Sequence, residues 1–522
     1  MPHPTVEILS PQDATLWWVQ GLDTPLHIGA LAFFDGGPLR EPDGRIRIDA
    51  IRARIGAQLE HTPRFRQRLV ELPLGQGLAW IDDDHFDLAH HVRLTALPRP
   101  GGDRELRDLV TDLLETPPDP TRPLWEIWVV DGLADGRVVL LPKVNHVMAD
   151  GTALLDFSIR MFDPGTDAGS TAPGEAATIW DPEPAPAPAS LLARGLAERS
   201  RRQVGALWQF AASATDPAVL SGLARSVVGL GGSGSGVAPS LPVTKPVGPR
   251  RDVVSLKLPW DDLERVKRAQ GTTLNDVVLA VTAGALAYYL EHSRPDTPTD
   301  TPTDVDTDLD RDAPGAPPGD GSGDAATGPA PRVLVPVSTH GRTVSGEFEN
   351  RFSMMVVDLP IAEHDPLVRL RTIHAEMDRH KASGQTKLGP LLFSLADLVP
   401  PWLLRTAAPP VLRNQPVVNL CVSNMPGSRD PLHLLGARLT DLYPYICGVG
   451  NIAVIIGVIS YLDALGVGLT VDADVVPDPD LLATGLRLAA AELVAAVDEA
   501  ADPAGDQARD QAARARRSRR AT

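Results

Sequence analysis

Apolar residues along the chain alternate between strand-like and helical spacing, which predicts an α/β protein. In the first half, residues 25–36 (PLHIGALAFFDG) form a strand-like run, while residues 48–59 and 104–114 carry apolar side chains at helical spacing. An earlier helix should begin at Pro11, because Ser10 can cap it and proline favours the first helical position.

A hairpin is predicted at residues 123–144 (PLWEIWVVDGLADGRVVLLPKV), where two apolar strands are joined through the Ala-Asp-Gly turn at 134–136. His146 then lies just beyond a strand end. The apolar spacing from Thr152 to Phe162 is helical. We therefore expect a strand, a tight loop and a helix, an arrangement that often presents a side chain to a cleft.

The second half repeats this alternation. A helix over residues 262–270 should close at Gly271, and Thr273 with Asp276 resembles a capping box at the start of the next helix. The remaining elements predicted from the pattern are strands at 252–259, 332–339, 351–360 and 416–427 and helices at 367–380 and 478–500.

Proline, glycine and charge-biased segments divide the chain. We expect a first α/β domain at 1–185, a helical crossover and flexible linker at 186–249, a second α/β domain at 250–503, and a basic tail at 504–522. The second domain contains a low-complexity Asp, Pro, Gly and Thr insertion near 293–332, which cannot bury enough apolar surface to fold.

One charge-free stretch, residues 442–462, is long enough to span a bilayer. It contains Pro444, Asn451 and three glycines among many β-branched residues, so two buried strands joined by a glycine turn is the favoured interpretation. The N-terminus lacks the pattern of a secretory signal, and we expect a cytoplasmic protein.

Composition narrows the class of function. The 522 residues carry a net charge of −18, which argues against nucleic acid as the main partner. Only two cysteines occur, Cys421 and Cys447, and they are interpreted as buried thiols. No metal or other cofactor is expected.

The candidate for chemistry is His146, four residues before Asp150-Gly151. A neutral imidazole can take a proton from a hydroxyl as that hydroxyl attacks a carbonyl. The spacing alone also fits a structural histidine, and Asp150 could either orient the ring or pair with an arginine to fix the loop. The adjacent pair His90-His91 lacks further ligands at metal spacing, which favours a solvated or loop-anchoring pair.

No P-loop, nucleophile elbow or dinucleotide fingerprint competes with His146. The ordered motifs resemble the bacterial wax ester synthase/diacylglycerol acyltransferases of the CoA-dependent acyltransferase superfamily. The matching stretches, in order, are LSPQDATLW (9–17), PRFRQRLV (63–70), FDLAHHVRLTALPRPG (86–101), PLWE (123–126), NHVMADG (145–151), TLNDVVLA (273–280), LVPVSTHGR (334–342), SNMPG (423–427) and DADVVPDPD (472–480).

The resemblance implies two similar domains, each a mixed β-sheet flanked by helices, with a tunnel at their interface. Acyl-CoA would enter from one side and diacylglycerol or a long-chain alcohol from the other. His146 would be the general base, and Asp150 and Gly151 would hold its loop. Asn145 stands where the family carries a first histidine, and asparagine cannot act as a base.

Four further residues are expected to shape the substrate site. By resemblance, Asn275 and Asp276 form the family's Asn-Asp motif, and Ser423 and Asn424 line the tunnel unless they only form a turn. The family usually carries Gly-Asn where this chain has Glu349-Asn350, and Asn451 is displaced from the family's usual spacing before Ser-Tyr. By resemblance, these two departures bear on acceptor specificity.

Two rival functions stay open from the sequence: a lipid-binding homologue that has lost turnover, and a condensation-type enzyme acting on carrier proteins. Peripheral contact with a membrane or lipid droplet is a further expectation. The apolar residues 391–404 (LLFSLADLVPPWLL) or the basic tail would supply it. For residues 391–404, a core helix that forms a wall of the tunnel is an equal alternative. For the basic tail, a solvated end is an equal alternative.

Overall fold

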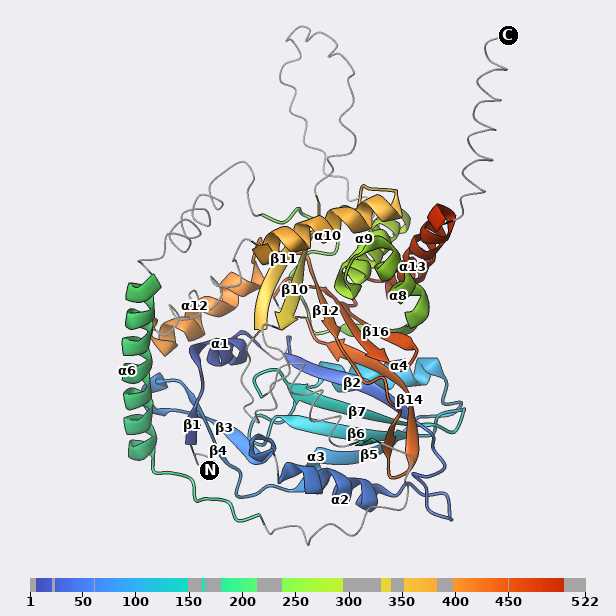
Figure 1. Cartoon of the computed structure of the whole chain (residues 1–522). Coiled ribbons are helices and arrows are strands. Elements are labelled where there is room, and N and C mark those ends of the chain that lie inside the picture. Colours follow the sequence, from blue (N-terminus) through green and yellow to red (C-terminus); the bar gives the residue numbers. More distant parts are fainter. Residues whose placement is uncertain are drawn as a thin grey trace, which may run out of the picture.

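A computed structural model describes residues 6–20, 24–60, 62–148, 162–164, 180–213, 237–293, 330–338, 352–382, 398–448 and 450–501. These form two mixed sheets flanked by helices, stacked one above the other in Figure 1, with a small third sheet at the side. The predicted α/β fold with two such domains is therefore confirmed.

The first large sheet has seven strands. One of its central strands is the predicted strand that leads to His146, which we call the motif strand. Its order is β5 (Val92–Ala96), β6 (Trp125–Asp131), β7 (Val138–Asn145), β2 (His27–Phe34), β14 (Ala437–Ile446), β13 (Leu432–Leu434) and β8 (Asp163–Pro164). Helices α1 (Pro11–Val19) and α2 (Ile48–Leu59) pack on one face, and α4 (Asp103–Glu115) packs on the other. A short helix, α3 (Leu88–His91), precedes the edge strand β5.

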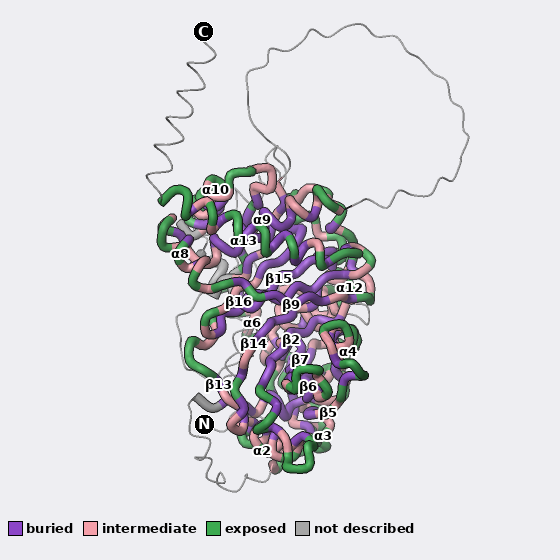
Figure 2. Tube along the Cα trace, turned by 90° about the vertical axis from the view of Figure 1, so that its right-hand side faces the viewer, coloured by how far each residue is buried: buried purple, intermediate pink, exposed green. Residues whose placement is uncertain are grey.

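The second large sheet has six strands in the order β11 (Phe352–Asp358), β10 (Arg332–Ser338), β12 (Leu420–Met425), β15 (Val454–Tyr461), β16 (Ala464–Asp472) and β9 (Arg251–Pro259). One face is covered by four helices: α8 (Trp260–Gln270), α9 (Leu274–His292), α10 (Pro366–Ala382) and α13 (Pro479–Ala501). Figure 2 shows the strands buried and much of the outer helical surface exposed.

The small sheet joins β1 (Val6–Ile8), β4 (Leu78–Asp82) and β3 (Gln67–Glu71). Beside it lie two short 3-10 helices, η1 (Pro63–Arg66) and η2 (Pro73–Gly75), and the long helix α6 (Pro188–Ser213). Helix α12 (Pro401–Arg413) packs against α1.

The two large sheets are joined by a strand exchange. β13 and β14 lie within the range predicted for the second domain, yet they complete the first sheet. β14 also runs against β16, where a Cβ atom on Gly466 would lie 1.8 Å from the carbonyl oxygen of Leu442, and one on Gly468 would lie 1.7 Å from that of Pro444. Only glycine permits this backbone approach.

The charge-free stretch 442–462 is confirmed as two buried strands around a glycine turn, with β14 in one sheet and β15 in the other. In the described part of the chain, no single helix has the length and hydropathy to cross a membrane. α8 and α9 together reach that length and composition, but they bend by 107° where they meet.

Several helix ends lie where local sequence signals predicted them. The Ser10 side chain accepts a hydrogen bond from the Asp13 amide at the start of α1, and Gly271 ends α8 with a φ of 65°. Residues 214–236 of the predicted crossover and linker, most of the insertion near 293–332 and the tail at 504–522 lie outside the described residues.

Candidate active site

The end of β7 is the element that positions His146. All eight residues of β7 are buried between β6 and β2. The Asn145 amide donates to the Leu124 carbonyl (2.9 Å), and the His146 amide donates to the Leu26 carbonyl (2.9 Å). His146 itself is half-buried. The backbone at Asn145 and His146 is therefore held by neighbouring segments of the chain, as a positioned catalytic group requires.

Both polar atoms of the Asn145 carboxamide make hydrogen bonds. Its Oδ1 accepts from the Val147 amide (3.0 Å), and its Nδ2 donates to Oε1 of Gln20 (2.7 Å) just beyond α1. The side chain is 3% exposed. These contacts form an Asx-type turn that holds the chain as it leaves the strand. Gln20 had no signal in the sequence that linked it to this motif.

The PLWE motif (residues 123–126) lies beside the motif strand and supports it. Trp125 is fully buried, its indole donates to the Phe65 carbonyl (2.7 Å), and its ring stacks on His91 at 4.6 Å between centroids. His91 Nδ1 lies 2.7 Å from the Trp125 carbonyl oxygen, so the loop-anchoring interpretation of this histidine is confirmed. Burial lowers the pKa of His91 to about 4. Within the described ranges, no cluster of three or more metal-binding side chains occurs.

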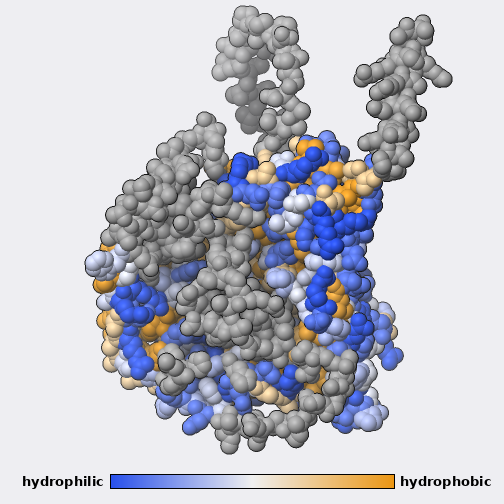
Figure 3. All heavy atoms as spheres, viewed as in Figure 1, coloured by the Kyte–Doolittle hydropathy of each residue, from blue (hydrophilic) through white to orange (hydrophobic). Residues whose placement is uncertain are grey.

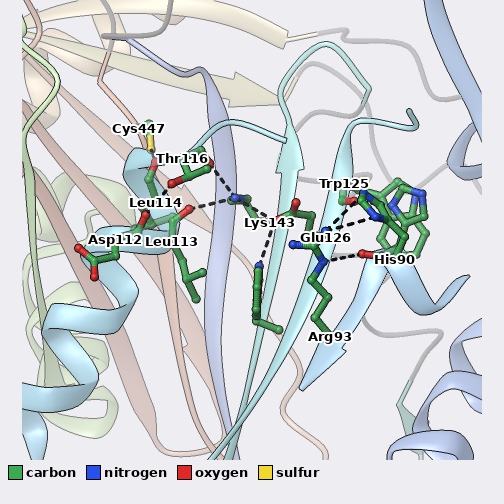
Figure 4. A network of polar contacts seen from close by, with 12 residues as sticks. His90, Arg93, Asp112, Leu113, Leu114, Thr116, Trp125, Glu126, Lys143 and Cys447 are labelled. Atoms are coloured by element: carbon green, nitrogen blue, oxygen red, sulfur yellow. Dashed lines mark hydrogen bonds and ion pairs between the residues drawn. The ribbon is translucent and has the colours of Figure 1, made fainter. Parts of the chain in front are cut away.

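A buried ion pair joins PLWE to β7 and α4 (Figure 4). Lys143 Nζ lies 3.1 Å from Glu126 Oε2 and donates to the carbonyls of Leu113 (2.9 Å) and Thr116 (2.8 Å) at the end of α4. Burial lowers the pKa of Lys143, and the Glu126 carboxylate opposes that shift. An ammonium among helix-terminal carbonyls is also favoured by the helix dipole. This contact locks two strands and a helix two residues before Asn145.

His27 is the register partner of Asn145 on β2 and is completely buried. Burial, with the charges of Lys143 and Arg251, lowers the pKa of His27 to about 3. The ring is therefore neutral in the folded protein at every pH above that value.

This burial predicts a loss of stability in mild acid. An unfolded histidine takes up a proton near pH 6.5, whereas folded His27 does not until about pH 3, so the free energy of unfolding should fall as pH drops through this window. The slope for one such group approaches about 1.4 kcal/mol per pH unit. Urea unfolding of wild type and His27→Met at pH 7, 6 and 5 should show a flatter dependence in the variant. The exposed His85→Gln serves as the control, and parallel losses in wild type and His27→Met would exclude the assignment.

At the start of α9, the predicted capping box is confirmed. The Thr273 amide donates to Asp276 Oδ2 (2.8 Å), and the Asp276 amide donates to the Thr273 hydroxyl (3.3 Å). Asp276 is fully buried, and its Oδ2 also lies 2.8 Å from Nδ1 of His374 on α10. The Asp276 carboxylate thus fixes the helix start that carries half-buried Asn275. His374 is 98 residues away and was not predicted.

Ser423 and Asn424 lie inside β12, half-buried and paired in parallel with Gly457 and Val458 of β15. The alternative that they form a turn is therefore wrong. The following Gly427 is the tight position, because a Cβ atom there would lie 1.9 Å from the Ser460 carbonyl oxygen. Lining of a tunnel by Ser423 and Asn424 stays a prediction.

The predicted residues fall into three places: Asn145 and His146 at the end of β7, Asn275 and Asp276 at the start of α9, and Ser423 and Asn424 in β12. Asp150 and Gly151 lie outside the described residues. A surface hollow of about 900 Å³ beside α2 and β5 is lined by none of these residues.

Known proteins resemble this chain over nearly its whole length. Residues 9–278 match the wax ester synthase/diacylglycerol acyltransferase catalytic domain, and residues 348–493 match the C-terminal domain of the same family. A probable diacylglycerol O-acyltransferase of Mycobacterium tuberculosis H37Rv is 32% identical over 482 residues, covering 90% of this chain and 91% of that protein. A putative diacylglycerol O-acyltransferase of the same organism is 32% identical over 514 residues, covering 94% of this chain and all of that protein.

Solved structures share the fold. The wax ester synthase/diacylglycerol acyltransferase from Marinobacter aquaeolei VT8 gives a TM-score of 0.60 at 23% identity, covering 94% of this chain and 100% of that one. The starter condensation domain of rhizomide synthetase gives 0.53 at 14% identity, covering 95% of each chain.

Proposed function

Because this chain belongs to the wax ester synthase/diacylglycerol acyltransferase family and is an acyltransferase, we propose that it transfers a long-chain acyl group from acyl-CoA to a lipid hydroxyl. The acceptor is diacylglycerol, a long-chain alcohol, or both. Diacylglycerol is favoured, because relatives 32% identical to this chain are described as diacylglycerol O-acyltransferases. The product would then be triacylglycerol.

The observation that supports turnover is the position of His146 directly after the buried strand β7. The backbone amides of Asn145 and His146 are both held there by hydrogen bonds. In the proposed reaction, His146 takes the proton of the acceptor hydroxyl as its oxygen attacks the thioester carbonyl carbon. The new C–O ester bond forms, the C–S bond breaks, and the proton passes from His146 to the departing CoA thiolate. No covalent acyl-enzyme is needed.

Asn145 is compatible with this reaction. The rival function, a lipid-binding homologue without turnover, rested on the loss of a histidine at this position. Here the Asn145 carboxamide is engaged with Gln20 and Val147, and it supports the turn that carries His146. This structural role needs no proton transfer, so the substitution is no argument against catalysis.

The reaction belongs at a lipid–water interface, since both acceptor and product dissolve in lipid. We place it on the cytoplasmic side of a membrane or on a lipid droplet, as part of the same proposal.

Release of free CoA from palmitoyl-CoA tests the function. The assay is run with dioleoylglycerol, with hexadecanol and with no acceptor. An acceptor-dependent release identifies an O-acyltransferase and its preferred lipid. A lipid-binding homologue would release no CoA with any acceptor, and a condensation-type enzyme would need carrier-bound substrates.

A further inference from the structure

Exposed apolar side chains gather on one side of the molecule, around α6, η2 and α12. Eight of the 14 exposed large apolar residues in the described part of the chain lie there: Leu74, Leu196, Val204, Leu207, Trp208, Trp402, Leu403 and Val411. We call this surface the α6–α12 face. Trp208 is 74% exposed and Trp402 is 58% exposed. Single exposed apolar residues are common, but a concentration with two tryptophans indicates a binding surface.

The two helices are not core helices that happen to reach the surface. None of the residues of α12 is buried, and on α6 the exposed positions Leu196, Val204 and Trp208 recur every four residues or multiples of four. The core-helix alternative for residues 391–404 is therefore wrong for the part within α12, which begins at Pro401. Figure 3 shows hydrophobic and hydrophilic residues interleaved over α6.

The two helices of this face carry a net charge opposite in sign to that of the protein. α6 carries four arginines and one glutamate, and α12 carries two arginines and no acidic residue, which gives the two helices a net charge of +5 in a chain of −18. Arg194, Arg201, Arg405 and Arg413 are exposed. Two copies of the chain meeting through this face would bring like charges together, whereas an anionic surface would be attracted.

The face is also close to the candidate active site. Between α6 and α12 runs a groove lined mainly by apolar side chains, including Ala14 and Trp18 of α1 and Leu404 of α12. α1 is nine residues long, about 14 Å, and the chain just beyond it places Gln20 against Asn145, the neighbour of His146. One short helix therefore connects the face to the motif strand.

We propose that the α6–α12 face docks the enzyme on an anionic lipid surface, with its tryptophans in the headgroup region and its arginines against the lipid phosphates. Tryptophan and arginine on one helical surface suit this environment. The role of docking in catalysis rests on the proposed function. Docking would bring a water-insoluble acceptor to the side of the molecule where α1 leads to His146.

Vesicle sedimentation of the full chain tests the docking. Wild type should bind phosphatidylcholine vesicles containing about a third phosphatidylglycerol, and Trp208→Ala/Trp402→Ala should bind at least tenfold more weakly. Arg201→Glu/Arg413→Glu should weaken binding to the anionic vesicles and remove its salt dependence. Leu488→Ala, an exposed apolar residue on α13, is the matched control and should bind like wild type.

Three outcomes overturn the docking proposal: wild type stays in the supernatant with anionic vesicles, the tryptophan variant sediments like wild type, or the tryptophan variant only converts a dimer to a monomer in size-exclusion chromatography. Activity separates this proposal from the function itself. CoA release with dioleoylglycerol in anionic vesicles should fall at least tenfold in the tryptophan variant, while release with water-soluble dihexanoylglycerol should be unchanged. Absence of release with both acceptors in wild type would overturn the function, while sedimentation would still decide the docking.

Discussion

His146→Ala should lower acceptor-dependent CoA release by about 10²- to 10⁴-fold, the usual effect of removing a positioned general base. The loss should appear in kcat, because the base acts in the chemical step, and binding of palmitoyl-CoA should persist. Initial rates with the best acceptor and equilibrium binding of palmitoyl-CoA measure the two effects. His146 follows the end of a buried strand, so its removal should leave the fold intact.

The neighbouring residue provides the matched control. Asn145→Ala removes the hydrogen bonds to Gln20 and Val147, so it should destabilise the protein by about 1–3 kcal/mol and lower the rate much less than His146→Ala does. Thermal unfolding and CoA release on the same preparations separate the two effects. If His146→Ala retained the wild-type rate with the best acceptor, the motif here would be structural and the base would lie elsewhere.

The sequence predicted those features that depend on a few neighbouring residues. Ser10 and Pro11 marked the start of α1, Gly271 marked the end of α8, and Thr273 with Asp276 marked the start of α9. These signals are local, because a cap or a left-handed glycine is set by hydrogen bonds within one helical turn.

Features built from distant residues were not predictable in this way. The pairing of β14 with β2 joins residues about 400 positions apart, and apolar alternation alone does not say which sheet a strand enters. The side-chain partners of Asn145 and Asp276 were unpredictable for the same reason. Gln20 reaches Asn145 and His374 reaches Asp276 only because the fold brings separate helices and strands together.

The PLWE motif shows how a functional signature can act through structure. The sequence matched it to a family without assigning its residues a role. The structure shows Trp125 and Glu126 as supports of the strand that ends at Asn145, with Glu126 paired to Lys143. We infer that these residues position His146 through β7, and that their loss would act first on stability.

Glu126→Gln should destabilise the protein by about 3–5 kcal/mol, because it leaves the Lys143 ammonium buried without its counter-charge. Urea unfolding at pH 7 measures the loss. The loss should shrink as pH is raised toward 10.5: burial already lowers the folded pKa of Lys143, and removal of the carboxylate lowers it further, so the folded variant releases this proton before the unfolded chain does. Stability of the variant therefore rises with pH in this range more steeply than that of wild type.

Two further variants show whether the buried charge is the cause. Glu126→Gln/Lys143→Met removes both charges and should regain part of the stability lost in the single variant, since an apolar side chain of similar size needs no counter-charge. Asp108→Asn breaks an exposed pair with Arg104 on the outer side of α4 and should change stability by no more than about 0.5 kcal/mol. If Glu126→Gln were as stable as Asp108→Asn at pH 7, the ion pair with Lys143 would not hold β6, β7 and α4 together, and the inference that Glu126 positions His146 through β7 would be wrong.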